Sequence, residues 1–411
     1  MEGTGQTARG SDAGASRGST SVLRRLLFAQ ETGLLIVIAL FAAWLTISGG
    51  TKQRIEQQPL PADAVITQSA DGFSVTREGT LVREYRAADG WSIRDLPDSK
   101  AAFRRVEVNK FLDLNNLVLL AKDASFFAII AVGMTGIIVM GGIDLSVGSI
   151  YALSAIVGAL MLRSINAGAP PGSGGAAWWL AIPAGLGVCC AVGGLCGLAN
   201  GAMIVGLRVH PFIITLGTMA VLRGVVFLVT RANTISEFPE SFTGGFIKAT
   251  IAGVEPVPVF LMATVVVLGA IVLGHTVLGR RTYAIGGNET AATYAGVPVG
   301  RVKLVVYTLS GVLAGLSSAV YLGYYGAASP DAGQGYELPV IAATVIGGAS
   351  LSGGRGSALG ALLGAILIQL ISNAMIILEI DTSYTQVVMG AAIIVAVVLD
   401  QAKARLVHRR G

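Results

Sequence analysis

The feature that most constrains this chain is a series of long apolar segments that fills most of residues 113–400. Each segment runs for 16 to 28 residues, and short polar breaks separate one from the next. A helix needs roughly 20 mainly apolar residues to cross a bilayer, so the pattern predicts an all-α polytopic membrane protein. The composition disfavours a soluble protein with a large core, because only 13% of the residues are charged and the mean hydropathy is +0.70.

The apolar segments predict about ten membrane spans. Their approximate limits are residues 33–48, 115–140, 146–163, 178–204, 210–230, 257–279, 303–326, 337–352, 357–378 and 383–400. If the N-terminus lies inside, fourteen Lys and Arg residues fall in the inner segments and three in the short outer loops. This asymmetry follows the positive-inside rule and predicts that both termini are cytoplasmic.

The remaining segments define the expected domain organisation. Residues 1–30 are rich in Gly, Ser and Thr and predict a disordered cytoplasmic tail, followed by a first transmembrane helix at 31–48, an extracytoplasmic insertion at 49–112, a transmembrane core at 113–402 and a basic cytoplasmic tail at 403–411. Residues 51–110 hold ten Lys/Arg and nine Asp/Glu. Alternating stretches such as GFSVTRE and TLVREYRA, which meet at Gly79, predict a small β-rich fold there. This insertion is either an external docking element or a solvated segment with no role.

A short polar motif recurs in the transmembrane core. GGIDLSVGS at 141–149 shares the pattern GGxxLSxG with GGASLSGGRGS at 347–357, and six predicted spans separate the two copies. The same orientation of both copies predicts two half-repeats in parallel arrangement. Each copy is either a capped turn or a hinge that flexes in transport, and the two interpretations are compatible. The candidate hinge or gating residues are Gly141, Gly142, Asp144, Ser146, Gly148, Gly347, Gly348 and Ser352.

The longest predicted cytoplasmic loop, residues 280–303, carries a helix signal of its own. Asn288 is a favourable N-cap, and Glu289 and two alanines follow it, so a short helix through Tyr294 is expected. Gly296 and Pro298 then end the helix. Such a helix suits a docking site for a cytoplasmic partner. The alternative interpretation of the same residues is a plain connecting loop.

Several functional classes are disfavoured by what the chain contains. Neither a nucleophile–base arrangement nor a metal-ligand cluster is apparent, and none of the seven lysines follows a glycine as a phosphate-binding P-loop requires. The ionisable residues within the predicted spans are few: Lys122, Asp123, Arg223 and His275. Lys122 and Asp123 are expected to pair, and Arg223 to snorkel or bind helix-end carbonyls. Ion-coupled carriers commonly use buried ionisable relays, so the small number of these residues disfavours ion coupling. A secondary transporter or a channel for a small polar solute is kept as the alternative function.

Four stretches together resemble the permeases of ribose-, xylose- and galactose-type ABC importers. They are GGIDLSVGS, LRVHPFIITLGTMAVLRGVVFLVT, YAIGGNETAATYAGVPVGRVK and VIGGASLSGGRGSALGALLGAILIQLI, and the likeness covers spans two to ten. The resemblance implies a non-enzymatic pore-forming subunit in the bacterial inner membrane, forming the path for a pentose or hexose. Glu289, Ala291, Ala292 and Gly296 match the family's EAA-like coupling helix, which would sit in a groove of the ATPase. The candidate ATPase-coupling residues are Asn288, Glu289, Ala291, Ala292, Tyr294 and Gly296.

The same resemblance implies the partners. Two cytoplasmic ABC ATPase subunits would use ATP and Mg²⁺, a periplasmic or lipid-anchored binding protein would deliver the sugar, and a second permease copy would complete a dimer. The chain itself is expected to need no cofactor or metal and to bind no nucleic acid. The insertion at 49–112 departs from the short segment usual in the family and leaves the contact with the binding protein open.

Overall fold

The computed structural model describes residues 30–61, 63–96, 99–169, 175–251, 253–384, 386–391, 394–395 and 398. Two compact units are distinguished. Ala42–Leu117 with Ile377–Glu379 forms a small unit that contains the strands, and the other described residues form a helical unit. Residues 1–29 of the predicted N-terminal tail, and the whole basic tail at 403–411, lie outside the described residues.

The small unit contains two three-stranded antiparallel sheets. In one sheet, β6 (Ser99–Asn109) lies between β1 (Thr51–Pro59) and β5 (Ser92–Leu96); in the other, β3 (Gly72–Arg77) lies between β2 (Val65–Ser69) and β4 (Thr80–Arg86). Phe73, Val75 and Tyr85 pack with Ala102 in one apolar cluster, so side chains from both sheets share a core. The predicted alternating strands on either side of Gly79 are confirmed.

The small unit contains an ion cluster around Asp113, the residue immediately before α3 (Leu114–Val139). The carboxylate of Asp113 contacts Lys52 Nζ at 2.7 Å and Arg54 Nη1 at 3.0 Å. The hydrogen bond from Lys52 lowers the pKa of Asp113 below its usual value. The two basic residues lie on β1, so the cluster ties the first strand of this unit to the last residue before α3 (Leu114–Val139).

Eight helices among the described residues are long and apolar enough to cross a membrane. They are α2 (Gln30–Ser48), α3 (Leu114–Val139), α4 (Val147–Ala167), α5 (Trp178–Leu207), α6 (Pro211–Thr230), α7 (Val257–His275), α10 (Val299–Tyr325) and α12 (Ala358–Ile377). Together with the two small sheets, they confirm the predicted polytopic helical class with a β-rich insertion. A π-helical turn, Thr243–Ile247, lies between α6 and α7.

Two predicted spans differ from the structure. The predicted span 337–352 contains α11 (Glu337–Ile346), which has ten residues. At 1.5 Å per residue, this helix is about 15 Å long, which is half of the hydrocarbon thickness of a bilayer. It is short because the glycine-rich motif that follows does not continue the helix. The tenth predicted span, 383–400, lies partly outside the described residues, and residues 386–391 within it are helical.

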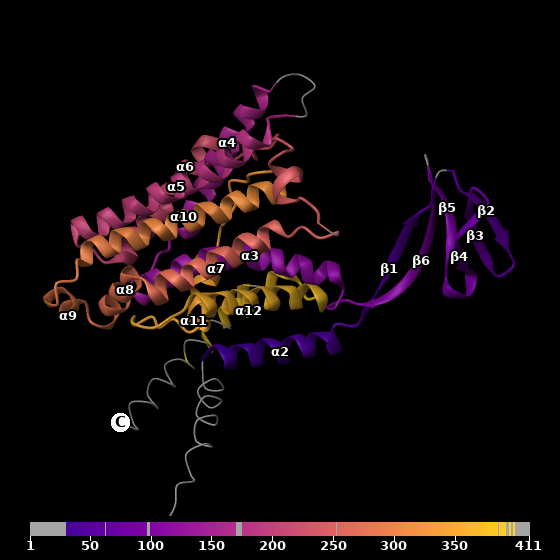
Figure 1. Ribbon diagram of the computed structural model, residues 1–411. Coiled ribbons are helices and arrows are strands. Elements are labelled where there is room, and N and C mark those ends of the chain that lie inside the picture. Colours follow the sequence, from indigo (N-terminus) through magenta and orange to yellow (C-terminus); the bar gives the residue numbers. More distant parts are fainter. Residues whose placement is uncertain are drawn as a thin grey trace, which may run out of the picture. The chain divides into compact units, whose positions relative to one another are not determined.

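The closest helix pair is held by small residues. Gly193 and Gly197 of α5 lie against Gly311 and Tyr307 of α10, where a Cβ atom on either α5 glycine would collide with backbone carbonyls. Figure 1 shows α5 and α10 side by side along most of their length. Small residues allow such close backbone approach between helices in membranes, which explains the glycine-rich sequence of α5. The three cysteines, Cys189, Cys190 and Cys196, also lie on α5 and are free thiols.

Candidate functional site

The predicted cytoplasmic loop folds into two helices at one end of the helical unit. They are α8 (Val277–Gly287) and α9 (Glu289–Tyr294), and Figure 1 shows both where α7 ends and α10 begins. The Asn288 side chain accepts a hydrogen bond from the backbone N–H of Ala291 at 2.9 Å, which confirms the predicted N-cap. After Ala295 the chain turns at Gly296 with φ of +82°, which favours glycine. The short helix expected from the sequence is therefore present.

The side chains of α9 have two different environments. Ala292 is 5% exposed and belongs to the main apolar core, whereas Tyr294 is 88% exposed. Ala291 contributes the backbone donor of the cap, and Glu289 forms an ion pair with Lys303 of α10, with Nζ and Oε1 at 2.7 Å. One face of α9 is thus fixed to the helical unit while a large aromatic side chain projects from the other.

Glycine contacts connect this loop to the end of α3 and to the second copy of the repeated motif. Gly286 of α8 lies so close to the carbonyl of Val139 and the N–H of Gly354 that a Cβ atom could not be accommodated. The N–H of Gly354 donates to the carbonyl of Val139 at 2.8 Å. In addition, the Tyr283 hydroxyl donates to the carbonyl of Gly356 at 2.6 Å. The end of α3, the second motif and α8 therefore meet at one place, which the sequence spacing did not indicate.

The first motif contains a buried polar network. Asp144 Oδ1 accepts hydrogen bonds from the Ser146 backbone N–H at 2.8 Å and from the Ser146 hydroxyl at 2.6 Å. The amide of Asn200, on α5, donates to the same hydroxyl at 2.8 Å. Asp144, Ser146 and Asn200 are each at most 1% exposed. Ser146 occupies the N-cap position of α4 without a side-chain capping bond. Its hydroxyl instead donates to Asp144 and accepts from Asn200.

The second motif contains mainly backbone turns. Gly347 and Gly348 donate to carbonyls in the last turn of α11, Ala343 and Val345, each at 2.9 Å. The φ angle of Gly348 is +102°, and that of Gly141 in the first motif is +81°. Ser352, which corresponds to Ser146, is exposed. Each copy thus has a positive-φ glycine, at the first motif position in one copy and at the second in the other, and the buried network is found in the first copy.

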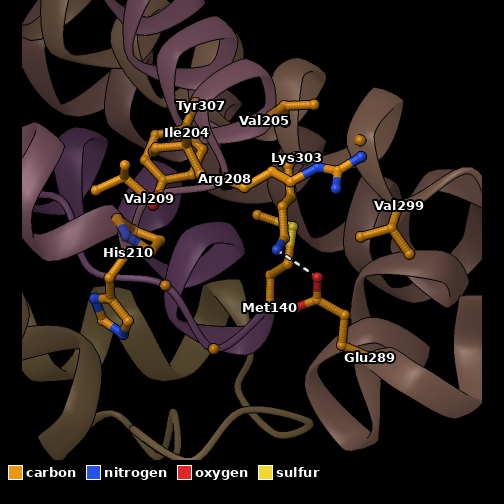
Figure 2. A pocket seen from close by; sticks show the side chains of 14 residues that line it. Met140, Ile204, Val205, Arg208, Val209, His210, Glu289, Val299, Lys303 and Tyr307 are labelled. Carbon is orange, nitrogen blue, oxygen red and sulfur yellow. Dashed lines mark hydrogen bonds and ion pairs between the residues drawn. The ribbon is translucent and has the colours of Figure 1, made fainter.

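A cavity of about 660 Å³ opens between the first motif and α9. Figure 2 shows its walls: Met140 beyond α3, Arg208 beyond α5, His210 before α6, and Glu289 paired with Lys303. Gly141, Gly142 and Tyr307 also line it. We call this space the inner cavity, because it lies at the predicted cytoplasmic side. Candidate coupling and hinge residues that are far apart in the sequence thus border one space.

The charged residues within the spans have partners that the sequence left open. Lys122 pairs with Glu255, Nζ to Oε2 at 2.8 Å, rather than forming the expected pair with Asp123. Arg223 donates from Nη1 to the carbonyls of Pro330 and Ala332, each at 2.9 Å, as expected for binding to backbone carbonyls. The sequence reasoning missed Glu337, which begins α11, although an acidic residue at the start of an apolar run was the available signal.

The helices and the two motifs define a polytopic membrane transport subunit. Comparison with known proteins assigns it further, since residues 116–397 match the family described as the permease component of the branched-chain amino acid transport system. The chain belongs to this family. The matched region begins after the strands of the small unit, which lie outside it.

Individual relatives agree with this assignment. The ribose import permease protein RbsC of Bacillus subtilis (strain 168) is 40% identical over 295 residues, which cover 72% of this chain and 87% of the relative. The D-allose transport system permease protein AlsC of Escherichia coli (strain K12) is 39% identical over 302 residues, covering 73% and 88%. The fructose import permease protein FruG of Bifidobacterium longum (strain NCC 2705) is 35% identical, covering 68% and 81%. No solved structure matches the chain.

Proposed function

We propose that this chain is the transmembrane subunit of an ATP-driven importer and forms the path for a pentose or hexose across the bacterial cytoplasmic membrane. The names of its relatives, which specify ribose, D-allose and fructose import, support a small sugar as the substrate. A separate solute-binding protein delivers the sugar, a second permease copy completes the path, and both termini are cytoplasmic. Cytoplasmic ATPase subunits hydrolyse ATP with Mg²⁺, because the lysines of this chain do not form a P-loop.

In this proposal α9 is the helix that docks on the ATPase. The contact of Gly286 with Val139 and Gly354 is the observation that carries it. A displacement of α8 and α9 necessarily acts on the end of α3 and on the second motif, since no side chain separates their backbones. Closely packed elements transmit displacements because they are bistable rather than continuously deformable.

The first motif acts as the gate in the same mechanism. It begins two residues after Val139 and borders the inner cavity through Gly141 and Gly142. The network of Asp144, Ser146 and Asn200 holds it against α5. When the ATPases close, movement of α8 shifts the end of α3, and the motif exchanges this arrangement for one that opens the path.

The test measures the ATP hydrolysed per sugar imported by the complete transporter in liposomes, with the Glu289→Trp, Gly296→Val double variant. Loss of the Glu289–Lys303 ion pair and of the left-handed turn should displace α9, so ATP hydrolysis persists while uptake falls at least tenfold. Glu237→Trp, at an exposed position in the loop after α6, is the matched control and should keep the ratio. Normal coupled uptake by the double variant would contradict the role of α9.

A further inference from the structure

A second cavity lies beyond the first motif, on the side away from α9. Its volume is about 360 Å³, and its walls include Ser149 of α4, Arg223 and Phe227 of α6, and Gln334 and Glu337 around the start of α11. We call this space the polar cavity. Its size falls within the roughly 300–1,000 Å³ of small-molecule sites, which combine apolar walls with a few polar groups.

One wall of the polar cavity holds a polar group without a partner. Ser149 is fully buried, with 0% of its surface exposed. Within the described residues, its hydroxyl has no hydrogen-bond partner. A buried hydroxyl that makes no hydrogen bond costs about 1–3 kcal/mol. Such an orphan group is explained by a ligand or water in the cavity that it lines.

The charged groups of the polar cavity favour a neutral ligand. Arg223 and Glu337 bring one positive and one negative charge, and Gln334 adds an amide that both donates and accepts. Within the described residues, the hydrogen bonds of the Arg223 guanidinium come from Nη1, so Nη2 and Nε are available to a ligand. Phe227 adds an apolar wall. Donors and acceptors without net charge suit a polyhydroxyl molecule better than an anion or a cation.

The charged residues of the polar cavity lie at membrane depth, so this face of the chain must be next to water or protein rather than lipid. Arg223 lies in the middle of α6. In the 18-residue apolar stretch of α6, 11% of the residues are buried within this chain, against 61% in each of α3, α4 and α12. Ionisable groups at membrane depth face the protein interior or a water-filled cavity, because exposure to hydrocarbon is costly. This face of α6 and α11 therefore borders water or protein rather than lipid, and a water-filled translocation path meets that requirement.

We infer that the polar cavity is a sugar-binding station in the path, in which Ser149, Arg223 and Glu337 hydrogen-bond the sugar hydroxyls. The inference rests on the proposed function, since it names where the imported sugar contacts this chain. The first motif separates the two cavities: Ser149, its last residue, lines the polar cavity, whereas Gly141 and Gly142 line the inner cavity. A sugar that leaves the station for the cytoplasmic side therefore passes this motif.

Gly148 allows the first turn of α4 to lie close to the start of α11 at the station. A Cβ atom there would collide with the carbonyl of Gly333 and crowd Oε1 of Glu337. Without a side chain at this position, the carboxylate of Glu337 lies over the first turn of α4, next to Ser149. The predicted hinge residue Gly148 thus acquires a specific role, which is to bring α4 and the start of α11 together around the sugar.

The test uses saturation-transfer difference NMR on the purified full chain in lipid nanodiscs, with D-ribose, D-allose and D-fructose as probes. We expect transfer to at least one sugar, and about a fivefold loss in each of Ser149→Ala and Arg223→Gln, as removal of one hydrogen bond predicts. Ser372→Ala on α12 and Arg163→Gln at the exposed end of α4 are matched controls and should retain the signal. Ser149→Ala keeps nearly the same volume, so it remains informative if Arg223→Gln does not fold.

Sugar uptake by the complete transporter distinguishes failure of the station from failure of the proposed function. Sugar uptake that depends on this chain, together with transfer lost only in the Ser149 and Arg223 variants, supports the station. Uptake without transfer in the wild-type chain, or with transfer unchanged in Ser149→Ala, overturns the station and leaves the proposed function intact. If uptake of no pentose or hexose depends on the chain, the proposed function fails and the inference fails with it.

Discussion

The two copies of the GGxxLSxG motif have the same sequence pattern and different surroundings. The first copy buries Asp144 and Ser146 in a network with Asn200 and lies between two cavities. The second copy exposes Ser352 and directs its backbone toward α8 through Gly354 and Gly356. The comparison indicates that the two copies, although alike in sequence, differ both in where their positive-φ glycines fall and in what surrounds their side chains. In our proposal the first copy acts on the path and the second on the loop that we assign to the ATPase.

The largest expected effect separates two adjacent glycines of α8. Gly286→Val should reduce sugar uptake at least tenfold, because its side chain would force α8 away from Val139 and Gly354. Gly287→Val is the matched control, since a Cβ atom there meets no atom within 4 Å. Uptake by cells with the complete transporter measures both. Equal uptake by the two variants would mean that the contact between α8 and the motifs has no part in coupling.

The next prediction compares corresponding serines. Ser146→Ala removes the hydroxyl that donates to Asp144 and accepts from Asn200, so it should destabilise the chain by about 1–3 kcal/mol. Ser352→Ala removes an exposed hydroxyl and should change stability by less than about 0.5 kcal/mol. Thermal unfolding of both variants in the same detergent compares them. A larger shift for Ser352→Ala would reverse the assignment of the buried network to the first copy.

The smallest expected effect concerns the positive-φ glycine that each copy has at its own motif position. Gly141 and Gly348 both have positive φ angles, so Ala at either position should destabilise by about 1–2 kcal/mol through backbone strain. The paired melting temperatures of Gly141→Ala and Gly348→Ala, with Gly287→Ala as the control, measure this common cost. Melting temperatures of both variants equal to that of the Gly287→Ala control would contradict backbone strain at these two glycines.

The sequence predicted elements whose signals are local. Apolar run length located the spans, Asn288 and Gly296 defined α9, and alternation around Gly79 defined strands. The half-length of α11 was missed because ten apolar residues and the following glycines read as one apolar run. The parallel half-repeats remain a prediction.

Long-range contacts were beyond the sequence. Asn200 lies among the apolar and glycine residues of α5, and nothing near it indicates Ser146 as its partner. Likewise, the spacing of Gly286 and Gly354 carries no information about their contact, because the path of the chain through the intervening α9, α10 and α11 decides it. The candidate site was therefore foreseen as separate motifs, and the fold brings them together.

The most direct test of the central claim is photocross-linking from position 294. Tyr294 is 88% exposed at the end of α9, so a photoreactive phenylalanine analogue there should capture an ATPase subunit in intact cells, identified by mass spectrometry. The same analogue at Glu237, in the predicted outer loop, is the control and should capture none. Capture of an ATPase from position 294 alone is the predicted result. Capture of an extracytoplasmic protein from position 294 instead would contradict both the orientation of the chain and the role of α9.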